Sequence, residues 1–371
     1  MTAGWRGAIA AACLMLPAPA LAQLQLNPPS AEQKAPAAKA PAKSTAKPAT
    51  RPAKAAPKAA KTDTQKKKSS PPSKAAPPAA AAAPAPDAPG ADAAYGAFQR
   101  GFYLTAFHLA TKRATDDNDV KAMTLLGELY SNGLGIPKNE TKAAEWYKLA
   151  SDRGDREAMF ALGMLRLAGR GGAQNREEGA RLLAAAAKLG HALAAYDLGL
   201  LYIEGHLFPQ DFSRAAELFR VAANAGNAEA QYALATFYKE GRGVPKDPQQ
   251  ATRLLSAATL AGNSDAEVEY AIALFNGDGI AKDEAGAAQV FLKSARKGNP
   301  IAQNRLSRIL AFGRGMPTNI PEALKWHLIA KAGGSTDLFM DEFAIKQSPE
   351  DRQQAAKAAQ PWIDQIKASK S

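Results

Sequence analysis

The chain has 371 residues, of which 46% are hydrophobic and 22% are charged, and its formal net charge is +12. One average is misleading, because the composition changes sharply near Ala91 and the chain must be taken as two regions. A single cysteine, Cys13, excludes a fold held together by a framework of intrachain disulfides.

The first 22 residues have the pattern of a secretory signal peptide. Arg6 supplies the positive charge, residues 7–16 form the apolar core, and Ala-Leu-Ala at 20–22 is a small-x-small cleavage site. We therefore expect a mature chain that begins at Gln23 and is periplasmic or secreted.

Two other fates of this segment are weighed against cleavage. The uncleaved signal could remain as a membrane anchor, but the apolar run is shorter than the about 20 residues of a spanning helix and is followed by Pro17 and Pro19. The second alternative is processing as a lipoprotein at Cys13, but the apolar segment before Cys13 is too short for a lipoprotein signal. Cleavage removes Cys13, and this excludes disulfides, thiolate metal ligands and a cysteine nucleophile in the mature protein.

Residues 23–92 are expected to form a disordered, semi-extended linker. From Pro28 to about Ala91 the segment is almost entirely Ala, Pro, Lys, Ser and Thr, which leaves too little large apolar surface to offset the entropy of ordering a chain. The linker carries twelve Lys and Arg residues against four acidic ones. We interpret it as a spacer, and the alternative is that it contacts peptidoglycan or anionic lipid. Export argues against nucleic acid as a partner.

The rest of the chain repeats with a period of 36 residues. Alanine, two glycines and an Asn or Asp each recur in one register without a slip. The positions are Ala122, Ala158, Ala194, Ala230, Ala266 and Ala302; Gly133, Gly169, Gly205, Gly241, Gly277 and Gly313; Gly154, Gly190, Gly226, Gly262, Gly298 and Gly334; and Asn139, Asn175, Asp211, Asp247, Asp283 and Asn319. A fixed period in this range is typical of a solenoid, so we predict six stacked helical hairpins over 122–334.

Each period contains the signals of two helices. The first runs from about Ala122 to Asn132 and ends at Gly133, which takes the left-handed cap conformation. Asn139 and its equivalents start the second helix as N-caps, and Gly154 turns the chain into the next hairpin. We expect about 85 to 90% helix in the folded part, with hairpin boundaries about every eighteenth residue.

The two ends of the folded part depart from the repeat, as the ends of a solenoid do. Residues 93–121, with Phe98 and Tyr103, are predicted to form a degenerate N-terminal helical hairpin. Residues 335–371 are predicted to form C-terminal capping helices, of which the last starts at Ser348.

The repeated motif Ala-x-x-x-Leu-Gly-x-Leu-Tyr-x-x-Gly-x-Gly, followed by Lys-Ala-x-x-Trp-Tyr-x-x-Ala and a closing glycine, resembles the Sel1-like repeat, a relative of the tetratricopeptide repeat. The resemblance implies an all-α fold, a right-handed α/α superhelical solenoid that acts as an adaptor in protein complexes. In exported bacterial members it implies an envelope signalling or host-contact factor.

The sequence departs from this pattern in three ways. Leu207 stands in place of a turn glycine, and Ala235, Ala271 and Ser307 stand in place of the glycine of the first helix, which predicts local changes of turn and packing. The cysteine pairs of one secreted subfamily are missing, which argues against the penicillin-binding character of that subfamily.

The sequence contains no reactive constellation of residues. The four histidines are far apart and have no ligand at helical or loop spacing: His108, His191, His206 and His327. Two Ser-x-x-Lys matches, at 44–47 and 294–297, lack the further motifs of a penicillin-recognising site. We therefore predict no metal, no cofactor, no catalytic residue and no enzymatic activity, and an envelope hydrolase is a remote alternative.

What remains is a surface. If the first helix of each unit lines the inner curve, as in tetratricopeptide relatives, the positions equivalent to Thr124, Glu128 and Ser131 share one face, which we call the first-helix stripe. Its candidate contact residues are Phe160, Met164, Tyr196, Leu200, Ile203, Tyr232, Thr236, Lys239, Ile272, Phe275 and Arg308. An apolar middle with polar ends fits a protein-binding groove, and the alternative is that these side chains pack within the superhelix.

These features together predict a non-catalytic protein–protein interaction scaffold or adaptor of the bacterial cell envelope. One form of this function is the extracytoplasmic part of a signalling system. The competing interpretation is a structural tether, in which the cationic linker holds the solenoid near peptidoglycan or anionic lipid.

Overall fold

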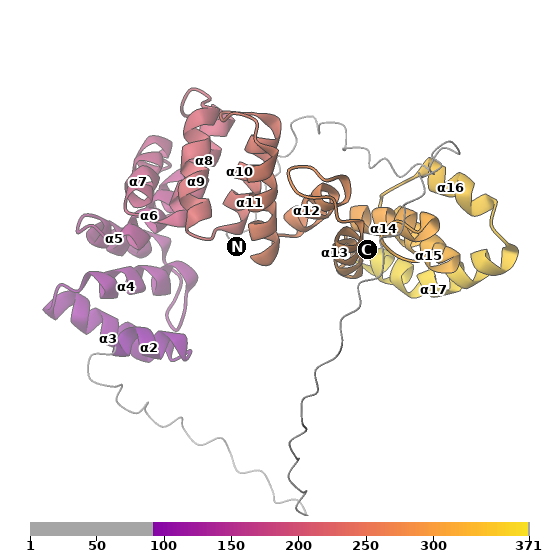
Figure 1. Ribbon diagram of the computed structural model, residues 1–371. Helices are drawn as coiled ribbons and strands as arrows, with labels where there is room; N and C mark the ends of the chain where they lie inside the picture. The colour runs from indigo at the N-terminus through magenta and orange to yellow at the C-terminus, as the bar shows by residue number, and fades with distance from the viewer. Residues whose placement is uncertain (1–91, 370–371) are drawn as a thin grey trace, which may run out of the picture. The chain divides into compact units, whose positions relative to one another are not determined.

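The computed structural model describes residues 92–369, which contain helices and turns and no strand (Figure 1). The helices are α2 (Ala93–Gln99), α3 (Tyr103–Asp116), α4 (Val120–Asn132), α5 (Glu140–Ser151), α6 (Arg156–Ala168), α7 (Arg176–Lys188), α8 (Ala192–Glu204), α9 (Phe212–Asn224), α10 (Ala228–Glu240), α11 (Pro248–Leu260), α12 (Ser264–Asn276), α13 (Glu284–Arg296), α14 (Pro300–Phe312), α15 (Ile320–Ala332), α16 (Leu338–Ile345) and α17 (Pro349–Ala368). The predicted signal peptide, 1–22, and the predicted linker up to Ala91 lie outside the described residues. Within 92–369, no helix is both long enough and apolar enough to cross a membrane.

Helices pack mainly against their neighbours in the chain. From α2 to α15, consecutive helices make the main contacts with one another, and α17 packs back against α15. Figure 1 shows the successive hairpins from α4–α5 to α14–α15, with α16 leading from the last hairpin into α17. Packing restricted to neighbouring units defines a solenoid, so the predicted all-α solenoid is confirmed.

The second helix of each unit starts at the capping residue that the sequence indicates. Asn139 accepts a hydrogen bond from the backbone N–H of Lys142 at 2.9 Å, and the Asn or Asp at the five equivalent positions caps its helix in the same way. Such a cap satisfies a backbone donor that has no partner inside the helix.

The first helices are capped just as regularly, which our sequence analysis missed. Their N-caps are Asp119, Asp155, His191, Asn227, Asn263 and Asn299. Five of them directly follow a turn glycine such as Gly154, so their recurrence could have been read from the sequence. Because of this cap, the first helix of the first unit begins at Val120 and not at Ala122.

The turn between the two helices of a unit depends on glycine at two places. Gly277 ends α12 with a φ of 85°, the left-handed conformation predicted for this position. A Cβ on Gly279 would lie 2.0 Å from the carbonyl oxygen of Pro248 in the preceding hairpin, so only glycine lets the two backbones approach this closely.

The third unit has Leu207 at this second position, and its turn differs as predicted. Asn118 is the only non-glycine residue with positive φ in the described part of the chain, so Leu207 does not adopt the glycine conformation. The turn is instead held by Phe208, whose ring stacks on Tyr202 with the centroids 5.0 Å apart.

Helix glycines make room for large side chains of the facing helix. A Cβ on Gly199 of α8 would lie 2.7 Å from the ring of Phe219, which is completely buried on α9. In the fourth unit Ala235 takes the glycine position, and the residue that replaces Phe219 in the repeat is the smaller Leu255. The exchange keeps the volume between the two helices filled. The fifth unit combines Ala271 with Phe291, both completely buried, so a substituted glycine does not always bring a smaller residue at the position of Phe219.

The hydrophobic core is divided along the solenoid. Three large clusters of buried residues follow one another in the chain, within 94–165, 167–237 and 268–359. Between the second and the third lies only a small cluster of Ala235, Leu255, Ala258 and Ala266. The buried apolar residues of α11 are only Ala251, Leu255 and Ala258, fewer than those of α10 or α12, so α11 is held by less apolar surface than the helices on either side.

The expected share of about 85 to 90% helix is wrong. The regular helices are 13 residues long, two in each 36-residue period, and the connection from Gly133 to Asn139 and its equivalents takes up much of the rest. The start of the last helix lies where the sequence indicates it. α17 begins after Ser348, whose side chain accepts a hydrogen bond from the N–H of Asp351.

Candidate interaction surface

The structure divides the first-helix stripe into a buried and an accessible set. The buried candidates belong to the core clusters, with relative exposures between 2% and 8%: Leu200, Ile203, Ile272 and Phe275. A partner that binds the folded surface does not reach these side chains. The accessible candidates are partly or fully exposed: Phe160, Met164, Tyr196, Tyr232, Thr236, Lys239 and Arg308.

Three aromatic residues of the accessible set occupy one position in three successive units. Phe160 on α6, Tyr196 on α8 and Tyr232 on α10 are each separated by 36 residues, and each is half-buried. In the next unit the equivalent residue, Val268, is 5% exposed and belongs to the core. The aromatic surface is therefore confined to units two to four.

Tyr232 lies beside several carboxylates. Its ring packs against the small alanine-rich cluster of α10–α12. Burial raises the pKa of the Tyr232 hydroxyl, and the charges of Glu269, Asp265 and Glu240 raise it further. Two of them are paired: Lys239 Nζ lies 2.6 Å from Glu269 Oε2, and Arg242 Nη2 lies 3.1 Å from Glu240 Oε2. The site thus combines an aromatic face with charged groups of both signs, a setting that suits a polar or hydrogen-bonding group of a partner.

The histidine next to Phe160 has a structural role. His191 is 6% exposed, its ring stacks on Phe160 at a centroid distance of 4.4 Å, and its Nδ1 accepts the N–H of Ala194 at 3.0 Å as the N-cap of α8. Since Nδ1 is an acceptor, Nε2 carries the hydrogen and donates it to Glu157, 2.9 Å away. His191 therefore orients Phe160 and caps a helix.

The C-terminal end of the stripe is organised by an ion pair. The Arg308 guanidinium donates from Nε to Asp337 Oδ2 and from Nη2 to Asp337 Oδ1, each at 2.7 Å. Burial would raise the pKa of Asp337, but the hydrogen bonds from Arg308 and Asn304 outweigh burial and lower the pKa to about 2. Asp337 is also the N-cap of α16, so this carboxylate fixes the last regular unit to the capping helices.

Ion pairs also join the turns of successive units, and the sequence analysis missed them. Arg314, between two turn glycines, pairs with Glu284, the first residue of the preceding second helix. Hydrogen bonds from Arg314 and Lys282 lower the pKa of Glu284 to about 2. Arg170 and Glu140 repeat this arrangement four units earlier. The signal in the sequence was the Gly-Arg-Gly turn placed 30 residues after a glutamate.

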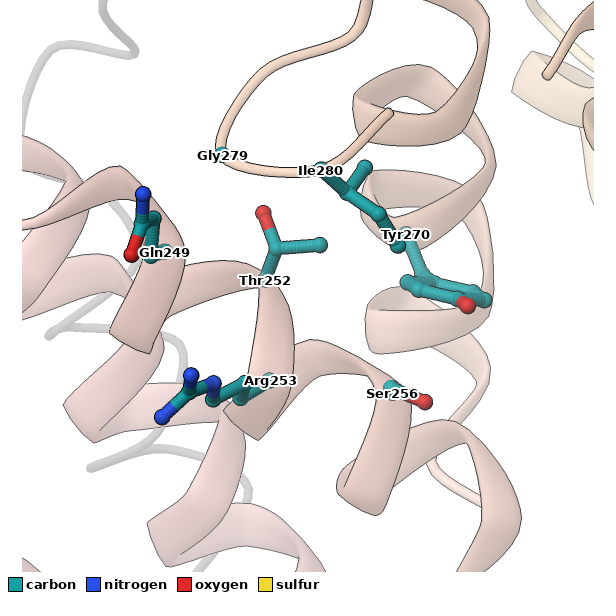
Figure 2. Close-up of a pocket in the computed structure, with 7 residues that line it drawn as sticks. All are labelled: Gln249, Thr252, Arg253, Ser256, Tyr270, Gly279 and Ile280. Carbon is teal, nitrogen blue, oxygen red and sulfur yellow. The ribbon is translucent and has the colours of Figure 1, made fainter. Parts of the chain in front are cut away.

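The pocket in Figure 2 lies between α11 and α12 and has a volume of about 320 Å³. Thr252 donates a hydrogen bond to the carbonyl oxygen of Asp278 at 2.7 Å and thereby ties α11 to the turn that carries Gly279 and Ile280. Tyr270 lies next to Ile280 across from α11 (Figure 2). The titratable side chains among its described lining residues are Arg253 and Tyr270, which form no acid–base cluster, and its lining matches the sparse packing of α11.

Among residues 92–369, the weak chemical motifs of the sequence are not assembled into a site, and the match at 44–47 lies outside these residues. Ser294 is 1% exposed, while Lys297 Nζ binds Glu267 Oε2 at 2.9 Å, so the two residues of this Ser-x-x-Lys match serve separate contacts. The buried His327 pairs with Asp341 at 2.9 Å. Within residues 92–369, no group of three or more His, Cys, Asp or Glu side chains is arranged to hold a metal ion.

Comparison with known proteins agrees with this architecture. A family model described as Sel1 repeat matches six consecutive stretches, at residues 120–155, 156–191, 192–227, 228–263, 264–299 and 300–335. Sel1 repeats typically form protein–protein interaction scaffolds, and Sel1 solenoids are typically non-catalytic. A search of the curated proteins found no match.

Two solved structures illustrate the similarity. A Sel1 repeat protein from Oxalobacter formigenes is 30% identical, with a TM-score of 0.52, and the match covers 65% of this chain and 97% of that chain. A protective antigen present in uropathogenic Escherichia coli strains, which displays an SLR fold, is 26% identical with a TM-score of 0.49. That match covers 71% of this chain and 65% of the antigen, so the chain matches less than two thirds of the antigen's length.

Proposed function

Because this chain belongs to the Sel1 repeat family, we propose that it is a non-catalytic scaffold that binds a protein partner along the accessible part of its first-helix stripe. The observation that carries the proposal is the row of half-buried aromatic residues Phe160, Tyr196 and Tyr232, repeated at one position of three units. Aromatic side chains that keep an exposed face contribute most of the energy of many protein interfaces.

The surroundings of this row support the same function. The neighbouring stripe positions Leu200 and Ile203 are buried, so the aromatic residues rest on a packed and pre-formed support. A pre-formed surface loses little conformational entropy when it binds, which favours recognition of another protein. The carboxylates around Tyr232 add a polar rim on one side.

Replacing Tyr232 by alanine tests the proposal. A partner can be recovered by crosslinking and pull-down with the full chain, and its affinity for the purified protein is then measured. We expect Tyr232→Ala to weaken binding by roughly 1 to 3 kcal/mol, the size of an aromatic hot spot. The expected change in melting temperature is small, because the ring is only half-buried.

Tyr238→Ala is a matched control, since Tyr238 lies on the same helix but binds the Arg220 guanidinium at 3.2 Å on α9. It should leave the affinity unchanged. If Tyr232→Ala instead loses roughly 3 to 5 kcal/mol of stability while the folded fraction binds normally, Tyr232 is a packing residue and the proposal fails at this position.

We further propose that the protein acts in the cell envelope, from the signal-like pattern of residues 1–22 and the cationic composition of residues 23–92. Amino-terminal sequencing of the protein from an envelope fraction should begin at Gln23. Finding the full-length chain in the cytosol would contradict export.

A variant that lacks residues 28–91 distinguishes the scaffold function from the tether function. A scaffold keeps its partner after the deletion, whereas a tether that binds peptidoglycan or anionic lipid through this basic segment loses its location.

A further inference from the structure

Arg305 on α14 carries a positive charge without a partner among residues 92–369. Its Nε is shielded from solvent and makes no hydrogen bond, and its guanidinium forms no ion pair with a described residue. Burial lowers the pKa of Arg305, and the adjacent charge of Arg308 lowers it further, while Asp337 offsets only part of this effect. A half-buried cation in this state is unfavourable until an acceptor arrives.

The nearest carboxylate is already engaged. Asp337 Oδ2 accepts from Asn304 Nδ2 at 2.8 Å and from Arg308 Nε, and Oδ1 accepts from Arg308 Nη2 and from the N–H of Met340 at 3.2 Å. The two arginines and one aspartate leave one positive charge uncompensated at this end of the stripe.

The repeat shows which partner Arg305 lacks. One unit earlier, the equivalent residue is Glu269, and it binds Lys239 of the unit before it at 2.6 Å. In the unit before Arg305, the position of Lys239 is occupied by Phe275. This residue offers no acceptor and is 2% exposed. The contact that neutralises this position between units four and five is therefore absent between units five and six.

We propose that Arg305 receives a carboxylate of the protein partner, and this inference rests on the proposed function. A guanidinium presents two parallel N–H groups that match the two oxygens of a carboxylate. A phosphate fits less well, because the dianion would also meet the negative Asp337. Ile301 lies one helical turn before Arg305 and is 38% exposed, so the recognised segment places an apolar residue next to its acidic one.

The test uses a library of random peptides with amidated C-termini, selected on the full chain. Peptides that bind should contain Asp or Glu beside an apolar residue. For a selected peptide, Glu→Gln should weaken binding to the unmodified protein by about ten- to a hundredfold, as expected for a charge-assisted hydrogen bond. A second library with free C-termini and no Asp or Glu distinguishes a side-chain carboxylate from the carboxylate of a chain end.

Two variants complete the test. Arg305→Met should bind the Glu and Gln peptides equally, and Arg305→Lys should recover only part of the preference, because it keeps the charge but not the planar fork. Arg253→Met, which removes an exposed arginine of α11, is the control for net charge and should keep the preference. The Arg305→Met protein should melt at the same temperature as the original or higher, since it loses an uncompensated charge.

Three results would overturn the inference. The first is that Arg305→Met still binds the Glu peptide more tightly than the Gln peptide, as the original protein does. The second is that the selected peptides show no preference for a carboxylate, and the third is that Arg305→Met unfolds at a markedly lower temperature, which would reveal a structural role. Peptides that bind near Tyr232 without a carboxylate would leave the proposed function standing while this inference fails. Recovery of no peptide at all would count against both.

Discussion

Phe219→Ala is expected to destabilise the middle of the solenoid by about 3 to 5 kcal/mol, the usual cost of truncating a fully buried aromatic side chain. Phe219 has no solvent exposure, and its ring lies 5.5 Å from both Tyr196 and Phe237, measured between centroids. The backbone of Gly199 faces the ring, so it cannot supply side-chain atoms to fill the cavity.

Urea unfolding followed by hydrogen exchange measures this effect. Since each unit contacts only its neighbours, we expect protection to fall first in α8, α9 and α10 and to be retained in α14 and α15. Leu260→Ala is the control, because Leu260 is an apolar residue that is 87% exposed, and it should change stability by no more than about 0.5 kcal/mol. If Phe219→Ala lowered the free energy of unfolding no more than Leu260→Ala does, Phe219 would not be a core residue.

Asp337→Asn is the second substitution with a large expected effect, about 3 to 5 kcal/mol at neutral pH, because it leaves the guanidinium of Arg308 without its carboxylate. The side chains of Asp337 and Arg308 are only 6% and 15% exposed, so solvent screens the pair weakly. Asparagine keeps one oxygen for the α16 cap, and the measured loss reports on the charge together with the hydrogen bonds that Asp337 Oδ2 accepts from Asn304 and Arg308.

The pH dependence of the same pair provides a separate measurement. The pKa of Asp337 falls from its ordinary value of 3.8 to about 2 in the folded protein. A lowered folded pKa means that the stabilisation is present above the unfolded value and is lost as the pH falls from about 4 to about 2. The stability difference between the original protein and Asp337→Asn should shrink over this interval.

The exposed pair of Lys148 and Asp152 is the matched control for charge removal. Both side chains are more than half exposed, and Asp152→Asn should cost at most about 1 kcal/mol. An equal effect of Asp152→Asn and Asp337→Asn would mean that burial does not strengthen the C-terminal pair.

The fold was predictable because its determinants are local and repeated. Glycine at Gly133 or an Asn at Asn139 acts on the backbone within a few residues, so periodic placement alone locates the turns and the second helices. The expected helix content was too high, because the residues between these two signals form a turn and a short irregular connection that has no apolar periodicity of its own.

The surface was predictable only in outline. Phe160 and Val268 occupy the same position of the first-helix stripe, yet Phe160 is half-buried and Val268 is 5% exposed, so the depth of a position is not fixed by the repeat alone. The sequence does not single out Arg305, which lies one residue away from the stripe. Its significance comes from Phe275 and Asp337, which are distant in sequence, and not from a motif.

The small alanine-rich cluster around α11 has a consequence for the way the whole array melts. In a linear array, cooperativity is transmitted only through the interfaces between neighbours, and it is interrupted where one interface is weak. The cluster around α11 has only four buried members, far fewer than the clusters on either side of it, and it shares none of them with those clusters. Units one to four and units five and six are therefore expected to behave as two cooperative blocks, in which one loses its structure while the other remains folded.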